Sequence, residues 1–184
     1  MMDWVQRGLF TSVEGVIVDM NAAREREGSL NGCNLYFTVE DDDGNTMVFL
    51  VTKDTCVIGG VTLKEGMRAG FWYRTDAPIP LIYPPQYYAV VAAEMRGDRM
   101  IDVSHYDDSL VNAEQTLQLQ LDWSVAMRTV NHQIFLGSPA GRDLAVIYTT
   151  STRSIPAQTT PTQVVVLCDD GGQGCFSPDC YPQA

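Results

Sequence analysis

Three cysteines near the end of the chain carry the most distinctive chemistry in the sequence. Cys168, Cys175 and Cys180 follow the spacing C-x6-C-x4-C in a stretch rich in Gly, Asp and Pro. Structural zinc sites favour cysteine pairs with two to four intervening residues and a fourth ligand, so a metal site is disfavoured. A segment of this composition cannot bury a core of its own. We therefore expect intermolecular disulfides from a tethered tail, with a frayed tail of reduced thiols as the alternative.

The other reactive side chains form no recognisable catalytic pattern. Cys33 and Cys56 lie in or beside strand-like segments, where buried inert thiols are the default and a mutual disulfide is the alternative. His105 and His132 have no partner at metal or triad spacing. Residues 40–45, EDDDGN, crowd carboxylates and suggest a calcium site. They lack EF-hand spacing, so a solvated hairpin tip is favoured. We expect no enzyme activity, no catalytic residues, no metal and no cofactor, because no known catalytic motif is present.

Composition and charge narrow the class of protein. The chain has 184 residues, of which 45% are hydrophobic and 19% charged, a length that suits one domain or two small ones. The net charge of −11 argues against nucleic acid and against an anionic membrane surface. No apolar run approaches the roughly 18 residues of a membrane span. The opening MMDWVQRGLF lacks a signal-peptide profile, so we expect synthesis in the cytoplasm and no membrane insertion.

Strand patterns dominate the chain. LYFTVE alternates apolar and polar residues, and DDDGN follows it before the apolar run TMVFLV, which predicts a hairpin. TLQLQLDW alternates in the same way, with Leu117, Leu119 and Leu121 on one face. Residues 21–30, NAAREREGSL, are interpreted as a polar loop or one short helix. The fold class predicted from these patterns is all-β.

Two parts of the chain repeat one pattern. Each has a glycine, a strand ending in Tyr-x-Thr, an Ile-Pro and a later proline before a final strand. The alignment places Gly66 on Gly141 and Tyr73 on Tyr148, and after a slip of one residue Ile79-Pro80 on Ile155-Pro156 and Pro85 on Pro161. We predict an N-terminal arm at residues 1–10, β units at 11–97 and 98–168, and a tail rich in Cys, Gly and Pro at 169–184. One fused sandwich is the alternative to two barrels.

The segment PIPLIYPPQYYAVV, residues 78–91, combines four prolines with three tyrosines. Proline cannot donate a ladder hydrogen bond, so this segment is interpreted as a rigid crossing between two strands. The tyrosines belong to the first copy of the repeat alone. A contact surface is therefore proposed, with ordinary packing over a barrel end as the alternative. Its residues are Trp72, Tyr73, Tyr83, Tyr87 and Tyr88.

The stretches PLIYPPQYYAVV, STRSIPAQTTPTQVVVLC and GMRAGFWY resemble an uncharacterised family of β proteins from anaerobic spore-forming bacteria. The resemblance covers approximately residues 10–168, and the strand pattern of each unit is similar to OB-like five-stranded barrels. It implies two tandem OB-like units and brings no catalytic residues. A spore surface would reconcile the missing signal peptide with disulfides, because such proteins are made in the mother cell and meet oxidising conditions on its lysis.

Together these patterns predict a non-enzymatic structural protein that assembles with itself into a surface polymer, such as a filament, ring stack or coat. The N-terminal arm is expected to add a strand to a neighbouring copy. The arm residues expected to make this contact are Trp4, Val5, Leu9 and Phe10. The alternative is an OB-like module that binds carbohydrate or protein through the Tyr, Trp and Pro surface of the first unit.

Overall fold

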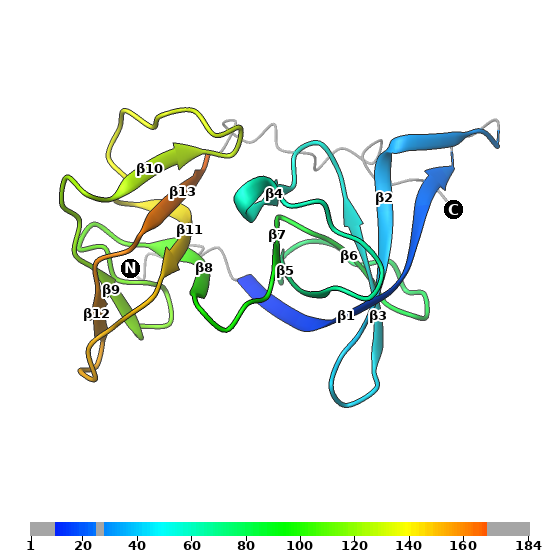
Figure 1. The fold of residues 1–184 in the computed structure, drawn as a ribbon, viewed down its shortest axis with the longest axis horizontal. Coiled ribbons are helices and arrows are strands. Elements are labelled where there is room, and N and C mark those ends of the chain that lie inside the picture. Colours follow the sequence, from blue (N-terminus) through cyan, green and yellow to red (C-terminus); the bar gives the residue numbers. More distant parts are fainter. Residues whose placement is uncertain (1–9, 25–27, 169–184) are drawn as a thin grey trace, which may run out of the picture. The chain divides into compact units, whose positions relative to one another are not determined.

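The computed structural model describes residues 10–24 and 28–168 (Figure 1). Their contacts divide them into two compact units. The N-terminal unit comprises Ser12–Tyr73 and Ala77–Met95, and the C-terminal unit comprises Arg96–Cys168 with residues 10–11 and Arg74–Asp76. The described residues form strands and one short 3-10 helix, η1 (Ile58–Gly60), so the predicted all-β class is confirmed.

The strands of the N-terminal unit form one hydrogen-bonded series, β4-β7-β5-β1-β2-β3-β6. The segment that contains β6 and β7 pairs first with β3 and then with β5, since Ala89 N donates to Leu50 O and Val90 N to Trp72 O. This segment therefore connects the two ends of the series, because β6 stands at one end and β7 near the other. The strands are β1 (Phe10–Arg24), β2 (Leu30–Glu40), β3 (Thr46–Val51), β4 (Cys56–Val57), β5 (Arg68–Arg74), β6 (Gln86–Tyr88) and β7 (Val91–Glu94).

The hairpin predicted from the Asp-Gly turn is confirmed. β2 and β3 pair antiparallel, with Glu40 opposite Thr46. The Asp41 carboxylate organises the loop between them, because its Oδ1 accepts hydrogen bonds from the backbone N–H groups of Asp43 and Asn45 at 3.0 and 2.8 Å. These bonds satisfy donors that the ladder leaves unpaired at a turn.

Gly15 allows β1 to pass close to β2. A Cβ atom at this position would lie 2.3 Å from the carbonyl oxygen of Glu40, which is backbone and cannot move aside. The pairing of β1 with β2 shifts register between Ile17 and Asp19, where Val18 is the extra residue of a bulge. Glycine at residue 15 thus permits the strand crossing that encloses the core.

The core of the N-terminal unit is aromatic. The rings of Phe49 and Phe71 stack with centroids 4.7 Å apart, and Phe37 lies 6.1 Å from Phe71 in a tilted arrangement. Ile17 and Val39 are fully buried beside them. The alternation read from LYFTVE places Phe37 and Val39 on this inner face, as expected for period-two strands.

The C-terminal unit repeats the pairing pattern. In the N-terminal unit β6 is parallel to β3, and β7 is parallel to β4 and antiparallel to β5; here β12 is parallel to β9, and β13 is parallel to β10 and antiparallel to β11. β11 also pairs antiparallel with β8. The strands are β8 (Met100–Tyr106), β9 (Leu117–Leu119), β10 (Ala126–Thr129), β11 (Arg142–Tyr148), β12 (Ala157–Thr159) and β13 (Gln163–Leu167).

The strand ladders correct the second half of the sequence alignment. Gly66 and Gly141 both precede the matching strands β5 and β11, and both have positive φ, which glycine tolerates. The proline directly before β12 is Pro156, and its counterpart directly before β6 is Pro85 rather than Pro80. Pro161 lies between β12 and β13. The sequence alignment matched the wrong prolines because the loop before β6 is longer than the loop before β12.

Residues 21–30 were interpreted as a loop or a short helix, and that interpretation was wrong for residues 21–24 and for Leu30, whereas residues 28–29 lie outside the strands. Residues 21–24 continue β1, and Leu30 begins β2. The two strands pair as far as Arg24 opposite Leu30, and they extend beyond β3 on the right of Figure 1. Alanines and polar residues hid this extension, because they give no apolar alternation to detect.

Candidate functional site

The structure disperses the aromatic residues that the sequence grouped into one contact surface. Trp72 is buried in β5. Tyr73 and Tyr87 stack on each other with ring centroids 4.1 Å apart, and both rings also lie against Phe49. Their faces are therefore largely occupied within the protein. Burial raises the pKa of Tyr73, and the neighbouring Tyr87 adds to that shift.

Tyr88 is also committed to internal contacts. Its hydroxyl lies 3.2 Å from the Thr52 hydroxyl, in hydrogen-bond contact. Burial raises the pKa of Tyr88, while hydrogen bonds from Thr52 and Thr55 oppose the shift. Four of the five predicted contact residues thus pack within the protein, which was the alternative interpretation. Tyr83 alone is exposed, at 91%.

Several exposed apolar side chains lie in residues 77–85, between β5 and β6, and Trp123, Ile134, Leu136 and Ile155 are also exposed in the C-terminal unit. We call residues 77–85 the apolar loop. Leu81 is fully exposed and lies beside Tyr83, and Ile79 and Ile82 are each almost half exposed. Its residues 77–82 form no ladder in the described structure. Large exposed apolar side chains that gather in one segment are typical of a contact site rather than of a solvated loop.

Sequence reasoning noticed the tyrosines of this loop and missed its aliphatic residues. Pro78 and Pro80 have no backbone N–H, so the segment around Ile79 cannot donate a full set of hydrogen bonds to a sheet. An aliphatic side chain in such a segment has no strand face on which to be buried. The sequence therefore contained a signal that these aliphatic side chains would be exposed.

The described cysteines are free thiols. Cys33 in β2 is exposed and Cys56 in β4 is buried, so the structure does not bring this pair together. Burial raises the pKa of the Cys56 thiol to about 11, as expected of an inert core cysteine. Cys168 follows β13 and is exposed. Cys175 and Cys180 lie outside the described residues.

The predicted assembly arm falls almost entirely outside the described residues. Trp4, Val5 and Leu9 are not among them. Phe10 is the first residue of β1, and the Arg74 guanidinium lies 5.5 Å from the centroid of its ring. A cation over an aromatic face at this separation is favourable.

A polar cluster inside the C-terminal unit was not predicted. The Asp102 carboxylate accepts a short hydrogen bond from the Tyr106 hydroxyl and a longer one, 3.4 Å, from Asn112 Nδ2. Ser104 Oγ donates to Glu114 Oε2 at 2.8 Å. Burial is the main cause that raises the pKa of Asp102, and the charge of Glu114 raises it further.

Asn112 is the centre of this cluster and is almost completely buried. Its Oδ1 accepts from the backbone N–H groups of Thr116 and Leu117 at 2.8 and 3.0 Å, and its Nδ2 donates to Thr116 Oγ1. Every group in this arrangement is directed at another group of the same unit. We interpret the cluster as a structural clamp on residues 107–116.

Among the described residues, His105 and Asp42 each have a charged partner on a neighbouring strand or loop. His105 Nδ1 lies 2.8 Å from Asp143 Oδ1, a contact between the neighbouring strands β8 and β11 that the sequence spacing did not reveal. Asp42, in the acidic hairpin, pairs with Arg68 at 2.9 and 3.0 Å. Among the residues that the structure describes, no three or more His, Cys, Asp or Glu side chains group as metal ligands.

Comparison with known proteins assigns no relative. No family model matches the chain, and no match was found among curated proteins. The family resemblance noted from the sequence stays a prediction. Within residues 10–24 and 28–168 there is no helix with the length and apolar character that crossing a membrane requires.

Proposed function

We propose that this chain is a non-enzymatic structural protein that assembles with other copies of itself, and that the apolar loop is one of its contacts. The observation that carries the proposal is the joint exposure of Leu81 and Tyr83 at the tip of a loop whose other exposed residues are also apolar. Residues 77–85 carry no charged side chain. Copies with a net charge of −11 repel one another, so a charge-free loop is the part best suited to contact between them.

We propose further that each unit is an OB-like barrel. The support is the pairing pattern, in which one segment is first parallel to an earlier strand, β3 or β9, and then antiparallel to a later one, β5 or β11. In the N-terminal unit that segment is β6–β7, and in the C-terminal unit it is β12–β13. OB-like barrels have a five-stranded, partly open sheet of this kind and present loops at one rim. The apolar loop takes the place of such a rim loop.

The chemistry of the loop favours a protein surface over a carbohydrate. Stacking on a sugar needs free aromatic faces, and because Tyr73 and Tyr87 are stacked on each other, the apolar loop offers the ring of Tyr83 alone. The exposed groups are mostly aliphatic, and aliphatic side chains cannot hydrogen-bond sugar hydroxyls. They gain free energy by removing apolar surface from water, approximately 25 cal/mol for each Å² buried.

Disulfides would then make the assembly permanent. Cys168 is exposed where β13 ends, and Cys175 and Cys180 follow it in the sequence. Thiols on a segment rich in Gly and Pro can meet the narrow geometry that a disulfide demands. The surface of a spore or cell is the proposed site of assembly, and it rests on the family resemblance.

Sedimentation velocity and negative-stain microscopy, each with and without reductant, test this proposal. Wild-type protein is expected to form assemblies whose size rises with concentration and whose covalent ladders disappear with reductant. The double variant Leu81→Ser with Tyr83→Ser should shift assembly to at least tenfold higher concentration. Ile155→Ser is the matched control, because Ile155 is an equally exposed apolar residue in the corresponding loop of the C-terminal unit.

A second candidate is a module that binds a different protein through the same loop. It is favoured by the observation that the apolar loop is confined to one of two similarly paired units, as expected when one unit has acquired a partner. A wild-type protein that stays monomeric at all concentrations, with or without reductant, would overturn self-assembly and leave this candidate.

A further inference from the structure

One edge of β1 has no partner strand among the described residues. β5 lies beside β1 as far as Ile17, whose backbone N–H donates to Met67 O and whose carbonyl accepts from Gly66 N. Beyond Ile17, β1 continues to Arg24 and pairs only with β2. We call residues 18–24 the free edge. Unpaired N–H and C=O groups along a strand are a template on which another strand can pair.

The free edge carries only part of the usual protection against pairing, namely the bulge at Val18 and the charges of Asp19 and Arg24. Residues 18–24 contain no proline and no lysine, the residues that most often block an exposed edge. Met20 lies opposite Phe37 and Ala22 opposite Leu35, so the apolar inner face of the unit continues onto the extension. Val18 and Met20 are exposed. A strand added here would therefore cover apolar surface as well as complete a ladder.

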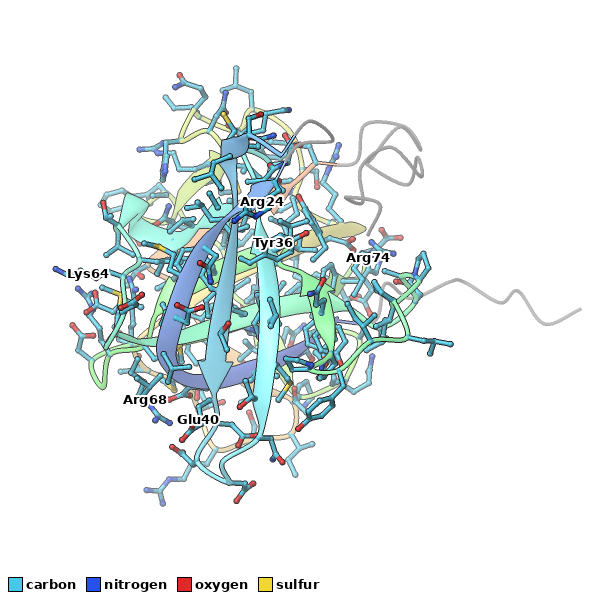
Figure 2. All side chains as sticks on the ribbon, turned by 90° about the vertical axis from the view of Figure 1, so that its right-hand side faces the viewer. Arg24, Tyr36, Glu40, Lys64, Arg68 and Arg74 are labelled. Atoms are coloured by element: carbon cyan, nitrogen blue, oxygen red, sulfur yellow. The ribbon has the colours of Figure 1, made fainter. Side chains whose placement is uncertain are left out.

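The charges of the free edge select its occupant. Asp19 stands near one end and Arg24 at the other, so the edge is neutral although the chain carries a net charge of −11. Two such edges that run antiparallel bring the Asp19 end of one copy to the Arg24 end of the other, at both ends of the pair. Figure 2 shows Arg24 far from Glu40 and Arg68, which lie at the opposite end of these strands. Opposite charges across a strand pair are stabilising, and like charges are not.

We propose that the free edge of β1 pairs antiparallel with the same edge of a second copy, so that the sheets of two N-terminal units join across a two-fold axis. This inference rests on the proposed self-assembly and names one of its contacts. A contact between identical patches closes at two copies. Growth into a polymer then needs a different contact, and the apolar loop supplies it.

Lysine substitution on the free edge separates this pairing from general effects on β1. Met20→Lys places a charge where the second copy would pack, as natural edge strands do. Val16→Lys is the matched control, because Val16 is 37% exposed against 38% for Met20 and lies where β1 already has β2 and β5 on its two sides. In reductant, which removes tail disulfides, Met20→Lys should raise the dimer dissociation constant at least tenfold in sedimentation velocity. Val16→Lys should leave it unchanged.

Hydrogen exchange on the unmodified full chain gives a second measurement. Amides of residues 18–24 should become more protected as protein concentration rises through the dimer range, while amides of the β2–β3 hairpin loop should not. Protection that does not depend on concentration would mean that the edge is covered within one chain, and would overturn the proposal. Equal effects of the two lysine variants would overturn it as well.

The two proposals fail in different ways. If Met20→Lys leaves a dimer intact and the apolar-loop variant disperses larger assemblies, the edge pairing is wrong and self-assembly stands. If the wild-type protein is a monomer throughout, both are wrong. A dimer that Met20→Lys abolishes and the apolar-loop variant does not affect supports the edge pairing by itself.

Discussion

The two units reach one pairing pattern with different interiors. The N-terminal unit surrounds stacked phenylalanines, and its β2 strand of eleven residues pairs with β1 and β3. The C-terminal unit has a core that is aliphatic apart from the buried ring of Tyr106. The position of β2 is taken by a short segment held by single bridges, Tyr106 to Asn112 and Val111 to Gln118. Where the backbone ladder is short, the Asn112 side chain supplies the missing hydrogen bonds.

The difference indicates what each unit needs in order to stay folded. A long two-sided ladder satisfies its own backbone groups, so the N-terminal unit can fill its interior mostly with apolar side chains, with Thr55 as a buried polar residue. A short segment leaves backbone N–H groups unpaired, and buried polar side chains must accept hydrogen bonds from them. The polar cluster is therefore a substitute for strand pairing, and the units should respond differently to the same kind of substitution.

The largest expected effect separates the two cores. Phe49→Ala should cost the N-terminal unit about 3–5 kcal/mol of unfolding free energy, because it leaves a cavity beside Phe71. Leu144→Ala, in the core of the C-terminal unit, should cost that unit about 2–5 kcal/mol. Hydrogen exchange in urea, followed for the amides of β3 and β11, reports each unit separately. Equal loss of protection in both units for either variant would show that they unfold together.

An intermediate effect tests the clamp. Asn112→Ala should cost the C-terminal unit about 1–3 kcal/mol, because it leaves the buried N–H of Leu117 without an acceptor. Asn45→Ala is the control in the hairpin of the N-terminal unit, where Asn45 is exposed and donates to Asp41. Its cost should stay below about 1 kcal/mol in the same urea titration. Similar costs for the two variants would contradict the idea that a side chain replaces the ladder.

The smallest effect is a dependence on pH. Burial raises the pKa of Asp102 above the ordinary value of 3.8, so the folded unit binds that proton more tightly than the unfolded chain does. Its contribution to stability is greatest at low pH and is lost as pH rises through the raised pKa. Relative to wild type, Asp102→Asn should therefore gain stability as pH rises across that window. Urea unfolding between about pH 3 and about pH 7 measures the difference.

An opposite slope is expected at an exposed aspartate of the same unit. The hydrogen bonds from Ser124 lower the pKa of Asp122, so its contribution is present at high pH and is lost as pH falls. Asp122→Asn should lose stability relative to wild type as pH rises. Curves of the same sign for both variants would count against the burial of Asp102 as the cause.

Local patterns predicted the fold class and the β2–β3 hairpin, because alternation and an Asp-Gly turn are set by nearby residues. Sequence identity alone could not align the second half of the repeat, because loop lengths differ between the units although the strand-pairing pattern is the same. The aromatic residues could not be sorted into stacked and exposed, since that depends on contacts distant in sequence. Asp102, Ser104 and Tyr106 alternate along β8 as a solvent-facing set would, yet they face the interior.

Cys56 gives the N-terminal unit an internal reporter of its own opening. The thiol lies buried in the short strand β4 and is protonated at neutral pH, so a thiol reagent cannot reach it while the unit is closed. Exposed Cys33 and Cys168 lack that shelter and should react first. The rate of the slow labelling phase would then report how often the N-terminal unit opens. Assembly that stabilises this unit would lower that rate.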